Sequence, residues 1–91
     1  MADVIITFKL MPTSPEVDLE GVKSKAKEAI AAFGGEVGKE KIEPVAFGLN
    51  ALILVFVMDE NKGSTEELEA QITNLEGVNS VECIDVRRAV G

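Results

Sequence analysis

The spacing of apolar residues along the chain predicts four strands and two helices. Residues 4–10 alternate between apolar and polar positions, so they are expected to form the first strand. Its apolar face comprises Val4, Ile6, Phe8 and Leu10. Residues 51–58 form a continuous apolar run rich in β-branched side chains, which is typical of a central strand. Residues 41–47 are expected to form an edge strand, because Pro44 has no N–H to donate to a neighbour.

The fourth strand is expected at residues 78–88, although its alternation is imperfect. Val81 and Cys83 share one parity, whereas Ile84 and Val86 share the other. An extra residue in a strand reverses the faces beyond it, so we expect a β-bulge near Cys83 or Ile84.

Two further segments repeat their apolar residues at helical spacing. The first follows Asp18, a suitable N-cap, and ends before Gly34 and Gly35, which can take the left-handed conformation that closes helices. Its apolar stripe comprises Leu19, Val22, Ala26, Ala29, Ile30 and Phe33. The second is expected to follow a capping box at residues 64–67 and to close at Gly77. Its apolar stripe comprises Leu68, Ile72 and Leu75.

The order strand, helix, strand, strand, helix, strand predicts a ferredoxin-like α+β fold. Right-handed crossovers place both helices on one face of a four-stranded antiparallel sheet. The first and third strands are central in this fold, and here they are the two most apolar strands. The opposite face is expected to meet solvent or a partner. With 91 residues, the chain is expected to be a single domain, residues 1–91, with its binding site on the surface.

The amino-acid composition argues against several classes of function. The chain has no histidine and one cysteine, Cys83, so the common zinc sites and nucleophile–histidine pairs are not available, and we expect no metal or cofactor. Its net charge of -7 argues against nucleic acid as a direct partner. No apolar run approaches the ~20 residues that cross a bilayer, and no secretory signal follows Met1. We therefore expect a cytoplasmic protein whose partner is another protein.

Two segments resemble the translation elongation factor 1-beta family. Residues 44–49, PVAFGL, are similar to the family's P-[IV]-[AG]-F-G-[IL] segment, and residues 85–88, DVRR, resemble the ending of its archaeal branch. The similarity extends over nearly the whole chain, including residues 11–20 and 76–78. The chain looks like the archaeal form of the family, which consists of the exchange domain alone.

The resemblance implies a guanine-nucleotide exchange factor that releases GDP from the GTPase elongation factor 1-alpha without covalent chemistry. In the family, the FG segment inserts an aromatic side chain into the GTPase, and the carboxyl-terminal end brings a basic side chain to the magnesium and phosphates. Phe47 and Gly48 match the first element. Arg88 matches the second, where eukaryotic members have a lysine, and Arg87 beside it is also a candidate. We expect both elements to face one GTPase surface and Asp85 to be a local salt-bridge or turn partner.

Two other functions are compatible with this fold. A small-ligand regulatory module would use the open sheet face and would be stabilised or dimerised by its ligand without any GTPase. An acylphosphatase-like enzyme would need an arginine in a phosphate-cradling loop after the first strand, and residues 11–14 contain none. The exchange factor is the hypothesis that the residues favour.

Overall fold

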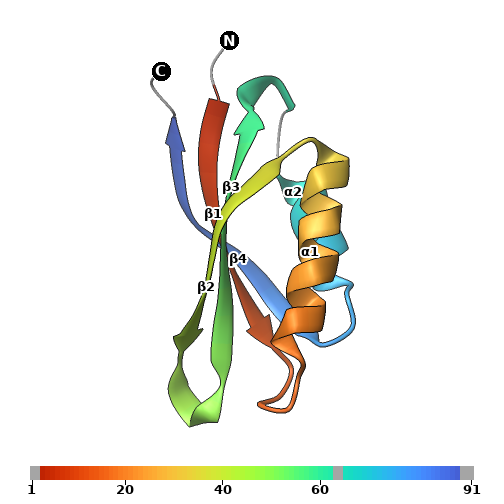
Figure 1. Cartoon of the computed structure of the whole chain (residues 1–91), viewed down its shortest axis with the longest axis vertical. Coiled ribbons are helices and arrows are strands. Elements are labelled where there is room, and N and C mark those ends of the chain that lie inside the picture. The colour runs from red at the N-terminus through yellow and green to blue at the C-terminus, as the bar shows by residue number, and fades with distance from the viewer. Residues whose placement is uncertain (1–2, 63–64, 89–91) are drawn as a thin grey trace.

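Four strands form one antiparallel sheet in the order β2-β3-β1-β4, and two helices pack on one of its faces (Figure 1). The computed structural model describes residues 3–62 and 65–88. Its elements are β1 (Asp3–Pro12), α1 (Leu19–Phe33), β2 (Glu36–Pro44), β3 (Asn50–Asp59), α2 (Glu66–Thr73) and β4 (Val78–Arg88). The ferredoxin-like α+β fold is confirmed, and β1 and β3 are the central strands as expected.

The core lies between the sheet and the two helices. Phe8 of β1 and Phe56 of β3 are fully buried, and their rings meet edge to face with centroids 4.9 Å apart. Such an aromatic pair adds about 0.5–1.5 kcal/mol to the stabilisation that burial itself provides. The helices contribute the buried side chains Val22, Ala26, Ile30, Leu68 and Ile72. Both predicted apolar faces therefore meet in one cluster.

The ends of α1 follow the sequence prediction. The Asp18 side chain accepts a hydrogen bond from the backbone N–H of Glu20 at 3.1 Å. Gly34 closes the helix with a φ of 106°, in the left-handed region that glycine enters without a steric penalty. Both predicted caps of this helix are confirmed.

The start of α2 differs from the expected capping box. Ser64 lies outside the described residues, and Thr65 is the N-cap without accepting a backbone hydrogen bond on its side chain. Its hydroxyl instead donates to the Glu69 carboxylate at 3.4 Å. The helix ends at Thr73, so Leu75 packs on the core from the connecting turn.

The edge strand β2 begins earlier in the chain than the sequence pattern predicts. It covers Glu36–Pro44 instead of residues 41–47, and Ala46–Gly48 forms a 3₁₀ turn. Nearly all of its residues are exposed at the sheet edge, so its polar amino half gives no alternating apolar signal. The absent N–H of Pro44 ends the ladder. The expectation of an edge strand is nevertheless confirmed.

The predicted β-bulge lies in β4. Thr7 is opposite Asp85 and Phe8 is opposite Cys83, which leaves Ile84 between them without a partner. The bulge turns the half-exposed Ile84 side chain onto the face of the sheet that carries Thr7. One inserted residue thus reconciles the two parities seen in the sequence.

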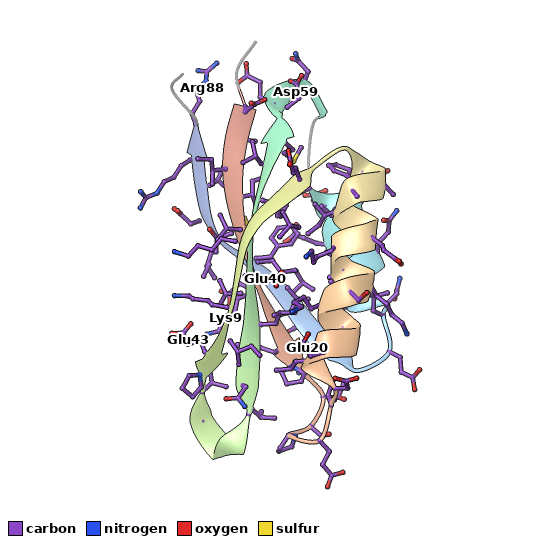
Figure 2. All side chains as sticks on the ribbon, in the orientation of Figure 1. Lys9, Glu20, Glu40, Glu43, Asp59 and Arg88 are labelled. Atoms are coloured by element: carbon purple, nitrogen blue, oxygen red, sulfur yellow. The ribbon has the colours of Figure 1, made fainter. Side chains whose placement is uncertain are left out.

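An ion-pair network ties the edge strand to α1. The Glu40 carboxylate contacts the ammonium groups of Lys23 at 3.1 Å and Lys27 at 3.3 Å, and Lys23 also contacts Glu20 at 2.8 Å. Figure 2 shows Glu40 and Glu20 on the helix side of the sheet. Hydrogen bonding from Lys23 lowers the pKa of Glu40, and hydrogen bonding to Glu20 raises the pKa of Lys23.

We expect Glu40→Gln to lower the free energy of unfolding at pH 7, because two lysines lose their shared carboxylate. Since the folded-state pKa of Glu40 is depressed, its contribution is present above the ordinary carboxyl pKa and is lost as the pH falls through the folded value. Urea midpoints of the variant and the parent should therefore differ at pH 7 and converge in acid. Glu43→Gln is the control, because Glu43 has no ion pair among residues 3–62 and 65–88. An equal loss of stability in Glu43→Gln would contradict the conclusion that the ion pairs of Glu40 are responsible.

Candidate partner-binding site

The hairpin between β2 and β3 carries the first candidate element. Its last opposed pair is Pro44 and Asn50, and the chain reverses through the 3₁₀ turn Ala46–Gly48. The Val45 N–H donates to the Leu49 carbonyl at 2.8 Å, and the Leu49 N–H donates to the carbonyl of Ala46 at 3.3 Å. These two bonds fix the turn at one end of the sheet.

Phe47 and Gly48 lie in this turn. Phe47 is its middle residue, and the Phe47 side chain lies outside the described part of the structure. Gly48 has a φ of +74°, which side chains rarely tolerate, and a Cβ added there would meet no atom within 4 Å. The glycine is therefore needed for the path of the backbone and not for a close contact.

The carboxyl end of β4 carries the second candidate element. The Arg87 Nε donates to the Asp85 carboxylate at 2.9 Å, which confirms the local salt bridge expected for Asp85. The Arg88 Nη2 reaches both carboxylate oxygens of Glu60, at 3.0 and 3.1 Å, from across the end of the sheet. Both arginine side chains remain largely exposed, so both can meet a partner.

The two arginines point to different faces of the sheet. Arg87 lies opposite Ile5 in the ladder, whereas Arg88 lies opposite Val4, which packs on the core. Residues directly opposite each other share a face, so Arg88 is on the helix-covered face and Arg87 is on the open face. Figure 2 shows Arg88 at the same end of the molecule as Asp59.

The hairpin turn and the arginines lie at opposite ends of the sheet (Figure 1). Pro44 is opposite Asn50 at the start of β3. Arg88 is opposite Val4, which is itself opposite Met58 near the end of β3. The eight residue steps from Asn50 to Met58 in β3 correspond to about 26 Å of strand. The four predicted site residues therefore form two separate groups and do not converge on one spot.

Residues 3–62 and 65–88 contain no group of three or more histidine, cysteine or acidic side chains that could hold a metal ion. No helix within the same ranges is long and apolar enough to cross a membrane.

Comparison with known proteins identifies the family. Residues 5–89 match the EF-1 guanine nucleotide exchange domain. This chain belongs to the EF-1 guanine nucleotide exchange domain family. It is 46% identical over 88 residues to the elongation factor 1-beta of Methanothermobacter thermautotrophicus, covering 97% of this chain and 98% of that protein. It is 40% identical over 89 residues to the elongation factor 1-beta of Methanocaldococcus jannaschii, covering 98% of this chain and 100% of that one.

Solved structures with low sequence identity share the fold of this exchange domain. The C-terminal domain of the MgtC protein from Mycobacterium tuberculosis superposes with a TM-score of 0.64 at 13% identity, covering 97% of this chain and 88% of that one. LarC2, the C-terminal domain of a cyclometallase, gives a TM-score of 0.59 at 12% identity, covering 99% of this chain and 58% of that one. These similarities concern the fold alone.

Family membership accounts for the overall role. The chain is a guanine-nucleotide exchange factor of translation elongation, as the resemblance implied. The structure adds Glu60, a contact of Arg88 that the sequence does not reveal, because 28 residues separate the two along the chain. Only the pairing of β1 with both β3 and β4 brings them to the same end of the sheet.

We expect Gly48→Ala to lower the free energy of unfolding by about 1–2 kcal/mol, because left-handed backbone costs a residue with a Cβ about that much. Gly48→Asn should lose less, since asparagine tolerates this conformation better. Gly38→Ala is the control, because Gly38 lies in β2 with open space around it and no positive φ. Urea unfolding of the three variants measures the differences. A Gly38→Ala variant as unstable as Gly48→Ala would contradict the backbone explanation.

Proposed function

We propose that the whole chain, residues 1–91, acts as one exchange domain that promotes GDP release from elongation factor 1-alpha and allows GTP to bind. The match of residues 5–89 to the exchange domain carries this proposal, because it includes both candidate contact elements. The factor would act in the cytoplasm during elongation. The excess of GTP over GDP then sets the direction of exchange.

The mechanism proposed here needs no covalent step. Mg²⁺ and oriented donors hold the phosphates of a bound nucleotide, so a cation brought to that site competes with the metal and weakens nucleotide binding. An arginine suits this role because it stays charged and can pair with two oxygens at once. The resemblance matches Arg88 to the family's terminal basic residue, and we propose that Arg88 or the neighbouring Arg87 supplies this cation.

The salt bridge between Arg88 and Glu60 does not prevent this action. Both side chains are substantially exposed, and an exposed ion pair contributes only about 0–1 kcal/mol. Arg88 can therefore leave Glu60 and pair with an acidic group of the partner at little cost in free energy. In the free protein, Glu60 keeps the guanidinium over the end of the sheet.

The separation of the two elements defines how the partner is held. With about 26 Å between the ends of the β3 ladder, the hairpin turn and the arginines contact two different places on the GTPase. Binding at both places favours the nucleotide-free form, and linkage requires that nucleotide weaken the factor's binding by the same factor. Coupling of about 1–3 kcal/mol changes affinity about 5- to 150-fold.

GDP release tests the proposal directly. Elongation factor 1-alpha loaded with fluorescent GDP and chased with excess GTP should release its nucleotide faster when the chain is added. The expected acceleration follows from preferential binding to the nucleotide-free GTPase. An unchanged release rate at saturating chain would reject the proposed function.

Variants at the two ends test the contact residues. We expect Phe47→Ala and Arg88→Ala each to slow stimulated release by on the order of 10-fold, since truncating an interface anchor commonly costs more than about 1.4 kcal/mol. Arg87→Ala, measured in parallel, shows which arginine acts. Lys25→Ala on the exposed side of α1 is the control and should retain full activity. Full activity of both the Phe47 and Arg88 variants would contradict the proposal that these two residues contact the GTPase.

A further inference from the structure

The side chain of Arg88 reaches across one end of the sheet to the turn that follows β3 (Figure 2). Strand β1 lies between β4 and β3, so this contact spans the width of a strand. The Arg88 Nη2 meets both carboxylate oxygens of Glu60, at 3.0 and 3.1 Å. A carboxylate far away in the sequence therefore sets the direction of the guanidinium at the end of β4.

The backbone of the turn after β3 holds Glu60 in place. Glu60–Lys62 forms a 3₁₀ turn. The Asp59 carboxylate accepts a hydrogen bond from the Asn61 N–H at 2.9 Å, and such a bond from an aspartate to the backbone two residues on stabilises a turn. The Glu60 side chain is 34% exposed. Because its backbone is fixed by this turn, Glu60 stays beside the end of the sheet whether or not Arg88 is paired with it.

Two other carboxylates near this end of the sheet are not placed to hold Arg88. Asp85 is paired with Arg87 on the open face. Asp3 has no ion pair in the described part of the chain, and the alternation of β1 places it on the open face as well. Arg88 lies on the helix-covered face, where Glu60 meets it.

The proposed action of Arg88 requires its guanidinium to leave Glu60. An acidic group of the partner must displace a carboxylate that belongs to the same chain as the arginine. Such a competitor has a high effective concentration, because it cannot diffuse away. Only the fraction of molecules in which Arg88 is free is ready to form the contact, and the apparent affinity falls by that fraction.

We propose that Glu60 competes with elongation factor 1-alpha for the Arg88 guanidinium and recaptures it as the complex comes apart. This inference rests on the proposed function and adds a positioning residue that controls the strength of the Arg88 contact. An exchange factor must leave its GTPase after the nucleotide has been replaced. A competing carboxylate in the same chain shortens the life of the complex without touching the GTPase.

Glu60→Gln tests the competition, because glutamine keeps the length of the side chain and removes its charge. Dissociation from immobilised nucleotide-free elongation factor 1-alpha is expected to slow about 2- to 5-fold, the factor that corresponds to an exposed ion pair of about 0.4–1 kcal/mol. The change is expected in dissociation because most differences in affinity between related complexes arise there. A substitution that merely loosened the fold would weaken binding, which is the opposite sign.

Two controls isolate the role of Arg88. Asp3→Asn removes the same charge at the same end of the sheet without breaking an ion pair of the described residues, so it should dissociate like the parent. In an Arg88→Ala background, Glu60 has no guanidinium to recapture, so adding Glu60→Gln should leave the dissociation rate unchanged. The difference between the two backgrounds measures the coupling of the two residues. Urea midpoints of all variants verify folding.

The outcomes separate this inference from the proposed function. If the parent chain stimulates GDP release but Glu60→Gln dissociates as fast as the parent or faster, the competition is wrong and the exchange function stands. If Glu60→Gln slows dissociation equally in the Arg88→Ala background, Glu60 does not act through Arg88 and the inference also fails. If the parent chain neither binds the GTPase nor stimulates release, both proposals fail.

Discussion

The contact between Phe8 and Phe56 determines how the sheet and its helices fit together. The two rings come from the two central strands and meet edge to face in the layer that α1 and α2 cover. With β1 and β3 held together at the centre of the sheet, β2 pairs with β3 through the short hairpin and β4 pairs with the other side of β1. The two outer strands are then the edges of the sheet.

Much of this architecture could be predicted from local sequence signals. The apolar run at residues 51–58, the stripe of α1 and the change of parity around Ile84 each reflect burial, which strongly restricts residue type. The first half of β2 could not be predicted, because an edge strand that exposes nearly all its side chains has few constraints on its composition. Its pairing with β3, which lies beyond the hairpin turn, is what makes Glu36–Pro44 a strand.

The sequence motifs supply the candidate site residues, but the arrangement of these residues in space could not be predicted. The motifs around Phe47 and Arg88 are short, and no spacing along the chain shows that they lie at opposite ends of β3. The different faces of Arg87 and Arg88 follow from strand alternation, yet which face is covered depends on the helices. The contact of Arg88 with Glu60 depends on both strand pairings and had no sequence signal. Geometry of this kind arises from topology and not from local propensity.

The exposed position of β2 has a consequence for self-association. An edge strand offers a row of unpaired backbone groups to any other chain, and charged side chains or proline on that edge discourage pairing. Lys39, Lys41 and Pro44 provide both features on β2. The lysines thus help to keep copies of the chain apart, so removing their charge would favour aggregation even in a fully folded protein.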